Sequence, residues 1–184
     1  GYDSNEEAYP VFYLFDGVNL FNSPAEAAGD YLIDETLDSL YEQGVLEGVI
    51  VLGLEHDVNY EWSEYLPWVN ENMHDWVSRR NSEAAEGGEG FAFTDFIVQT
   101  LKPEIDARYR TLTNAENTAI GGFCRMGLIP VVAAIEYPDT FGHVMAMSPA
   151  VWMAEEGGRW LSNNNFINYI NNNPVPENVN FYAD

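Results

Sequence analysis

The sequence predicts an α/β fold built on a mainly parallel central sheet of about five strands. Unbroken apolar runs of strand length alternate along the chain with segments of helical periodicity. Such runs suit strands of a parallel sheet, because helices cover both faces of that sheet. A length of 184 residues, of which 46% are hydrophobic, is enough for one core, so we expect a single domain over residues 1–184.

The first half of the chain predicts a strand, a helix and a second strand. Residues 11–15 are all apolar and are closed by an Asp-Gly pair, and a loop is expected at 18–21. Residues 30–43 carry apolar side chains three and four positions apart, which predicts an amphipathic helix that ends at a glycine. The second strand is predicted at 49–54. This order forms a βαβ unit, whose two strands run parallel.

Residues 55–90 show no regular period and mix aromatic with acidic side chains. We predict an irregular, lid-like insertion over the carboxyl edge of the sheet, where functional loops of α/β proteins lie. The Glu- and Gly-rich stretch 82–90 is expected to be its most flexible part. The alternative is a solvated insertion whose aromatic residues pack on the core.

The second half predicts three more strands. The segment from residue 118 leads through a glycine-flanked corner into an apolar helix. The remaining elements are a helix near 96–105 with a proline near its end, a strand at 144–147, a helix within 160–170 and a strand at 179–183.

The charge of the chain narrows the classes of partner. The net charge is −23, from 30 acidic residues against seven basic ones, and Lys102 is the only lysine. Such a surface repels nucleic acid and anionic membranes and suits a saline or secreted setting, so we expect neither partner and a secreted or periplasmic location. No apolar run approaches the roughly 20 residues of a membrane span. The chain opens on polar, acidic residues without a signal peptide, and its single cysteine rules out an internal disulfide.

The corner within residues 118–129 has the setting of a nucleophile elbow, and Cys124 is the candidate nucleophile. An elbow has the pattern G-x-S-x-G, because the glycines let strand and helix approach closely. Gly122 supplies the first glycine, but Met126 stands where the second belongs. An alignment with one added residue would use Gly127 instead, and the sequence leaves both alignments open.

Several blocks along nearly the whole chain resemble the esterase group of α/β-hydrolases. That group includes carbohydrate esterase family 1, feruloyl and acetylxylan esterases, enterobactin-type esterases and mycolyltransferases. The blocks are 1–4 (GYDS), 9–21 (YPVFYLFDGVNLF), 64–68 (EYLPW), 101–111 (LKPEIDARYRT) and 137–142 (YPDTFG). The resemblance implies an α/β-hydrolase-like three-layer sandwich with helices on both faces of the sheet. It also implies a Ser-His-acid triad acting on an ester, without a cofactor.

The resemblance places candidate site residues by position. Cys124 stands where the family has its serine, and the backbone N–H groups of Val18 and Arg125 would form the oxyanion hole. The aromatic residues and the amide expected to line the substrate cleft are Asn19, Trp62, Tyr65, Trp68 and Trp152. The family's acid and histidine would follow Asp184, and further strands would precede Gly1. The chain therefore resembles a hydrolase domain shortened at both ends, and Asp184 itself lies slightly before the position of the acid.

Three histidines could substitute as the base. His143 precedes the fourth strand, at the edge opposite the elbow, so we expect a structural or surface role. His74 lies in polar surroundings and is expected to be exposed. His56 ends the second strand at the correct edge and is a weak candidate for the base.

Two functions from different classes follow. The first is a carboxylic ester hydrolase acting on a small-molecule or carbohydrate-linked ester, such as acyl or feruloyl esters of carbohydrates, which aromatic side chains could stack on. A thiolate at position 124 would be stabilised by the following helix and by Arg125. The second is a catalytically silent binding module, since small buried cysteines in turns are usually inert. Mycolyltransferase-like acyl transfer is a third outcome, and the oligomeric state is left open.

Overall fold

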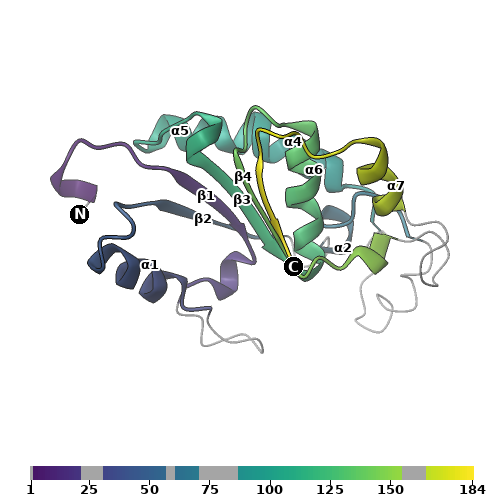
Figure 1. The fold of residues 1–184 in the computed structure, drawn as a ribbon, viewed down its shortest axis with the longest axis horizontal. Helices are drawn as coiled ribbons and strands as arrows, with labels where there is room; N and C mark the ends of the chain where they lie inside the picture. The colour runs from purple at the N-terminus through teal and green to yellow at the C-terminus, as the bar shows by residue number, and fades with distance from the viewer. Residues whose placement is uncertain (1, 22–30, 57–60, 71–86, 155–164) are drawn as a thin grey trace.

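The computed structural model describes residues 2–21, 31–56, 61–70, 87–154 and 165–184. Its strands form one sheet in the order β2-β1-β3-β4-β5, and every neighbouring pair is parallel (Figure 1). The strands are β1 (Val11–Phe15), β2 (Ile50–Leu54), β3 (Thr118–Phe123), β4 (His143–Met147) and β5 (Asn180–Ala183). The predicted parallel sheet is confirmed.

The strand order creates a change of direction at the centre of the sheet. From β1 the chain goes to β2 on one side, whereas β3 lies on the other side of β1 and leads on to β4 and β5. The loops after β1 and β3 therefore leave neighbouring strands in opposite directions. In open α/β sheets ligands bind in the crevice at the carboxyl ends of two such strands. The residues after Phe15 and Phe123 are accordingly the first place to look for a site.

Helices flank both faces of the sheet, as predicted. They are α1 (Ile33–Glu42), α2 (Glu61–Glu64), α4 (Gly90–Phe96), α5 (Lys102–Arg108), α6 (Leu128–Glu136) and α7 (Asn165–Asn172). In Figure 1, α1 lies on the opposite side of β1 and β2 from α5. No helix in the described ranges is long and apolar enough to cross a bilayer.

The helix predicted near 96–105 differs in its extent. It begins at Gly90, and a π-helical turn (Ile97–Leu101) joins α4 to α5. Pro103 therefore lies in the first turn of α5 instead of near the end of the helix. The π-helical turn shifts the backbone hydrogen-bond register just before Pro103, which has no N–H to donate.

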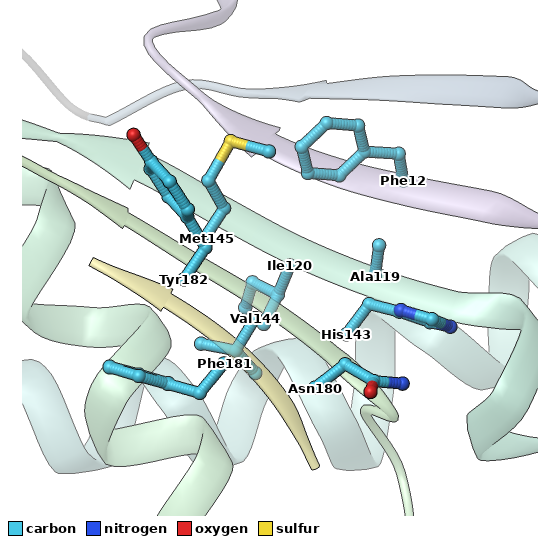
Figure 2. Close-up of a pocket in the computed structure, with 9 residues that line it drawn as sticks. All are labelled: Phe12, Ala119, Ile120, His143, Val144, Met145, Asn180, Phe181 and Tyr182. Carbon is cyan, nitrogen blue, oxygen red and sulfur yellow. The ribbon is translucent and has the colours of Figure 1, made fainter. Parts of the chain in front are cut away.

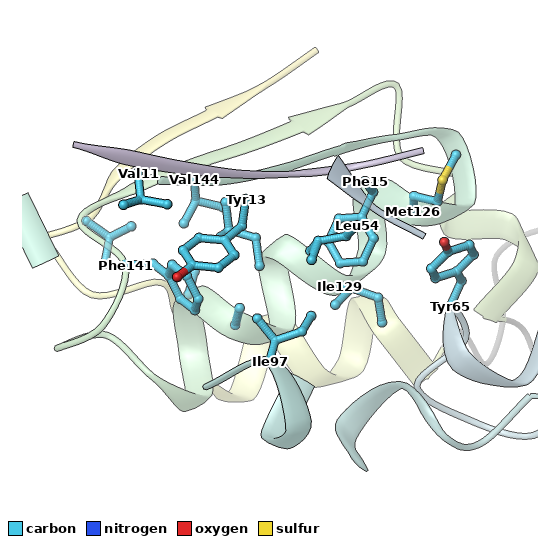
Figure 3. Close-up of a cluster of buried hydrophobic side chains, with 14 of the residues drawn as sticks. Val11, Tyr13, Phe15, Leu54, Tyr65, Ile97, Met126, Ile129, Phe141 and Val144 are labelled. Atoms are coloured by element: carbon cyan, nitrogen blue, oxygen red, sulfur yellow. The ribbon is translucent and has the colours of Figure 1, made fainter. Parts of the chain in front are cut away.

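The face of the sheet beneath α4, α5 and α6 holds the main core. β1 contributes Val11, Tyr13 and Phe15, which lie on one face because alternate residues of a strand share a face. Ile97 and Ile129, both fully buried, pack against them from the helical layer (Figure 3). Apolar burial of this kind contributes about 1.5–3 kcal/mol for each side chain.

The other face of the sheet carries a pocket of about 360 Å³. Phe12, Met145 and Tyr182 lie along it (Figure 2). Phe12 and Met145 alternate in sequence with the core residues Tyr13 and Val144, so they point to the opposite face. Tyr182, on the edge strand β5, is 53% exposed. This face is therefore less well covered than the one beneath α4 to α6.

The predicted insertion at 55–90 falls partly outside the described residues, which omit 57–60 and 71–86. Within the described part, α2 begins at Glu61, and Trp62 and Leu66 are buried in one hydrophobic cluster. The helix predicted within 160–170 is observed from Asn165, and residues 160–164 lie outside the described ranges.

We predict that Lys102→Met lowers the free energy of unfolding by about 3 kcal/mol, measured by urea denaturation. The ammonium group of Lys102 is nearly buried and lies 2.7 Å from the carboxylate of Asp106, and it donates to the carbonyl of Thr113 at 3.2 Å. Removing one partner leaves a charge in a poorly solvated place, which is costly.

The matched control is Arg108→Met. Arg108 pairs with Glu104 in the same i,i+4 spacing, but both side chains are more than half exposed. Exposed pairs are worth about 1 kcal/mol or less. Equal losses in the two variants would contradict the structural role assigned to Lys102.

Candidate active site

Cys124 occupies a strained turn directly after the central strand β3. Its backbone φ is +57°, a value that residues other than glycine seldom adopt. A short 3-10 turn (Cys124–Gly127) follows and leads into α6. A Cβ added at Gly122 would lie 2.3 Å from the carbonyl oxygen of Met126, so the returning chain approaches the strand there too closely for any side chain. The turn residue is therefore Cys124 itself, with the required glycine two residues before it.

The thiol of Cys124 is free and half-buried. The carbonyl of Cys124 accepts a hydrogen bond from the N–H of Ala150 at 2.9 Å. This contact holds the segment after β4 beside the turn. That segment carries Trp152, which is 43% exposed. Trp152 therefore lies two residues beyond this contact with the elbow.

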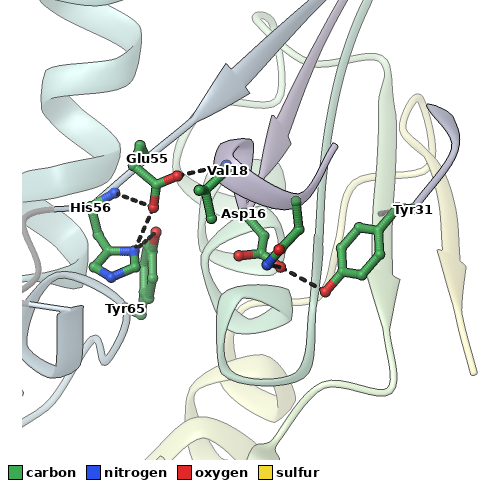
Figure 4. Close-up of polar contacts among 7 residues, drawn as sticks. Asp16, Val18, Tyr31, Glu55, His56 and Tyr65 are labelled. Carbon is green, nitrogen blue, oxygen red and sulfur yellow. Dashed lines mark hydrogen bonds and ion pairs between the residues drawn. The ribbon is translucent and has the colours of Figure 1, made fainter. Parts of the chain in front are cut away.

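The loop after β1 is held by the side chain of Asp16. Asp16 also has a positive φ, +68°, and its carboxylate accepts hydrogen bonds from Asn19 Nδ2 at 3.0 Å and from the Tyr31 hydroxyl at 2.6 Å (Figure 4). A Cβ added at Gly17 would lie 3.0 Å from the backbone of Gly53 in β2, so the loop rests directly on that strand. The backbone of the loop is thus fixed from two sides.

Tyr31 links this loop to the elbow. Burial, the hydrogen bond to Asp16 and the negative charge of Asp16 raise the pKa of Tyr31 to about 12. The positive charge of the Arg125 guanidinium acts in the opposite direction and lowers the same pKa. The β1 loop and the elbow follow adjacent parallel strands, so both lie at one edge of the sheet.

The N–H of Val18 points to a carboxylate. It donates a 2.7 Å hydrogen bond to Oε2 of Glu55, which follows β2 (Figure 4). Oε1 of the same carboxylate accepts from the N–H of His56 at 3.3 Å and lies 3.0 Å from its Nδ1. That Nδ1 also lies 3.0 Å from the Tyr65 hydroxyl. Burial, followed by the negative charge of Glu55, raises the pKa of Tyr65.

The residues expected to line a cleft occupy different positions. Trp62 and Tyr65 are buried, and the Arg125 guanidinium carbon lies 5.1 Å and 6.0 Å from their ring centres. At these distances cation–π attraction holds the guanidinium against the two rings, which support it from within the protein. Asn19 is also buried, and its side-chain amide donates a hydrogen bond to the Asp16 carboxylate.

Trp68 packs on the same hydrophobic cluster as Trp62 and Cys124. Its ring contacts Phe91 and Tyr169 at 5.4 Å between centres, so it packs α4 against α7. Of the predicted cleft residues, Trp152 is exposed and Trp68 is partly buried, while Trp62, Tyr65 and Asn19 are buried. The aromatic content of the loop could not distinguish these positions, because burial depends on how the loop folds back.

The histidines and Asp184 are also placed by the structure. His143 is exposed at the start of β4, the edge opposite the elbow, and its Nε2 lies 3.0 Å from the carbonyl of Glu116. His74 falls outside the described residues. Asp184 follows β5, and its Oδ1 accepts hydrogen bonds from the N–H of Ser148 at 2.5 Å and from the Ser148 hydroxyl at 3.3 Å.

Sequence reasoning missed Asp16, Tyr31 and Glu55 as members of this edge. Asp16 and Glu55 each follow an apolar strand directly, and this position was a usable signal, since carboxyl ends of parallel strands share an edge. Tyr31 carries no such signal.

The sheet and the turn together define the class of protein. A parallel sheet with a strained strand-to-helix turn over its carboxyl edge, and a loop N–H donor on the neighbouring strand, is the arrangement of the α/β-hydrolase fold. Residues 1–182 match the family described as "Putative esterase". The chain therefore belongs to this esterase family.

Individual relatives are distant. The chain is 24% identical over 151 residues to the uncharacterized protein YbbA of Bacillus subtilis (strain 168), an alignment that covers 82% of this chain and 54% of YbbA. It spans about half the length of that curated relative. The enterobactin esterase FES from Shigella flexneri superposes with a TM-score of 0.67 at 18% identity, covering 93% of this chain and 38% of FES. A ferulic acid esterase superposes with a TM-score of 0.56 at 21% identity, covering 82% and 51%.

Proposed function

We propose that the protein hydrolyses carboxylic esters through an acyl intermediate on Cys124. The observation that carries this proposal is the strained φ of Cys124 at the end of the central strand, which presents a half-buried thiol at the switch point of the sheet. Membership of the esterase family supports an ester as the substrate. Backbone strain at such a position is typical of a functional residue.

The proposed reaction has two halves. The Cys124 sulfur forms a bond to the ester carbonyl carbon, and the carbonyl π electrons move onto oxygen. The N–H groups of Val18 and Arg125 stabilise that oxyanion. When the carbonyl re-forms, the C–O bond to the alcohol breaks, and the alkoxide takes the proton that the thiol lost. Water then attacks the thioester, which releases the acid and restores the thiol.

The substrate class we propose is an acyl or feruloyl ester of a carbohydrate, with an aromatic acyl group favoured. The exposed rings of Phe123 and Trp152, which are 46% and 43% accessible, support this choice. Phe21 and Tyr31 add exposed aromatic area on the loop side. Flat phenolic groups stack on such rings with a gain of about 0.5–1.5 kcal/mol.

The test is to trap the acyl intermediate. The protein is incubated with 4-nitrophenyl acetate and, separately, with methyl ferulate, in imidazole buffer that can supply a base. We expect nitrophenolate release above the buffer rate and, by peptide mass spectrometry, one acyl group on Cys124. Because the chain has one cysteine, prior alkylation with iodoacetamide blocks this residue selectively and provides the control. Release equal to buffer, with no acylated peptide, would exclude the proposal.

A second candidate is a binding module that uses the same crevice without turnover. It is favoured by the positions of the two described histidines, since His56 is held by Tyr65 and Glu55 and His143 lies at the opposite edge. For this module, methyl ferulate would bind and protect Cys124 from alkylation without being consumed.

Acyl transfer is tested by adding an alcohol acceptor to the trapping assay. A new ester of that alcohol would reveal the transfer.

A further inference from the structure

Glu55 occupies the backbone donor that the proposed ester hydrolysis assigns to the oxyanion. The carboxylate oxygen Oε2 lies 2.7 Å from the N–H of Val18, the short distance typical of a charge-assisted hydrogen bond (Figure 4). An oxyanion hole must present its donors to the oxygen of the substrate. In this arrangement an internal anion already takes one of them.

The carboxylate has a second place to bind. Oε1 lies 3.3 Å from the backbone N–H of His56 and 3.0 Å from its Nδ1. The side chain of Glu55 is 44% exposed, so solvent reaches the carboxylate. Loss of the Val18 contact would therefore leave Glu55 anchored at His56. In the observed position, one carboxylate oxygen holds Val18 and the other holds His56.

The surrounding charges make this position matter for the reaction. Burial and the negative charges of the nearby carboxylates, Glu55 first, raise the pKa of Tyr65, and the positive charge of Arg125 lowers it. A protonated His56 would neutralise the negative charge of Glu55, because its Nδ1 lies 3.0 Å from the carboxylate. An oxyanion that forms beside Val18 would meet a like charge within hydrogen-bonding distance of the same N–H, which opposes its formation.

We propose that Glu55 occupies the N–H of Val18 in the resting protein and must withdraw toward His56 before an ester acylates Cys124. This inference rests on the proposed function. If so, Glu55 slows the acylation of Cys124 and leaves the reactivity of the thiol toward alkylation unchanged. The two effects can be separated, because alkylation of a thiol forms no oxyanion whereas acylation does.

The test compares two reactions of the single cysteine in the full chain. Rates of acylation by 4-nitrophenyl acetate and of alkylation by iodoacetamide are measured for the parent protein, Glu55→Ala and Glu55→Gln. We expect the ratio of acylation to alkylation to rise about 10- to 100-fold in Glu55→Ala. One oxyanion donor is worth about 100- to 1,000-fold in rate, and the variant recovers part of that factor. Glu55→Gln should fall between, since its neutral amide oxygen accepts the Val18 N–H more weakly.

Glu47→Gln is the matched control, because it removes the same charge from an exposed position before β2. Its ratio should equal that of the parent protein, and all melting temperatures should agree within a few degrees. A ratio for Glu55→Ala equal to or below the parent value would overturn the role of Glu55. So would a parallel rise of both rates, which indicates better access to the thiol. Alkylation without acylation in every variant would instead refute the proposed ester hydrolysis.

Discussion

Cys124→Ala is expected to lower kcat/KM for a reporter ester by at least about 1,000-fold, to a rate close to that of buffer. The reason is that the variant keeps the turn but loses the atom that forms the covalent bond. Removal of a nucleophile in such an enzyme typically costs factors of this size or larger, because the oxyanion donors and the binding surface supply only the remainder. The measurement is the initial rate of nitrophenolate release across a range of ester concentrations.

The control for this variant is its stability. Alanine meets the same backbone strain at φ +57° as cysteine, and the side chain is only half-buried, so the urea midpoint should change little. Retained activity in a folded Cys124→Ala protein would place the reaction elsewhere. Loss of activity together with loss of structure would be judged against Cys124→Ser, which keeps a group of similar size in the turn.

Gly122→Ala is expected to lower the free energy of unfolding by about 3 kcal/mol or more, with loss of esterase activity. The added Cβ would lie 2.3 Å from the carbonyl oxygen and 2.7 Å from the carbonyl carbon of Met126. Both are backbone atoms, so a rotamer change cannot relieve the contact. The turn must open, which displaces Cys124. Denaturant unfolding followed by circular dichroism measures the loss.

Gly44→Ala supplies the comparison. Gly44 has a φ of +68°, but nothing lies within 4 Å of an added Cβ. Its replacement therefore carries only the cost of a left-handed conformation, about 1 kcal/mol. A loss in Gly122→Ala no larger than that in Gly44→Ala would show that strand and helix are not in close contact at the turn.

The strands were predictable because each is a nearly unbroken apolar run. The run at 11–15 coincides with β1, and the prediction of strands at 49–54 and 179–183 is correct to within one residue at their starts. Periodicity could not foresee the π-helical turn before Pro103, because i→i+5 hydrogen bonding leaves no separate sequence pattern. The helix predicted near 96–105 extends from Gly90 to Arg108 in the structure.

The candidate site was predictable in part. The turn at Cys124 was predicted from the preceding glycine and from the strand-to-helix order, and the positive backbone φ places the turn at Cys124 itself. The contact between Val18 and Glu55 joins residues 37 positions apart, and it depends on β1 and β2 being neighbours. Trp62 and Tyr65 were expected in a cleft and lie in the interior, because their loop folds back onto the core.

The amino-acid sequence by itself determined the class of fold, the position of the turn at Cys124 and the strongly acidic surface, since apolar runs, glycines and charges act locally and can be counted. The tertiary structure decided which loops meet at the edge of the sheet. Strand order sets this, and strand order is the outcome of packing between segments far apart in the chain. The sequence could not reveal that Asp16 and Glu55 lie at the same edge, because this depends on β1 lying between β2 and β3. The same holds for Tyr31, which is held there by Asp16.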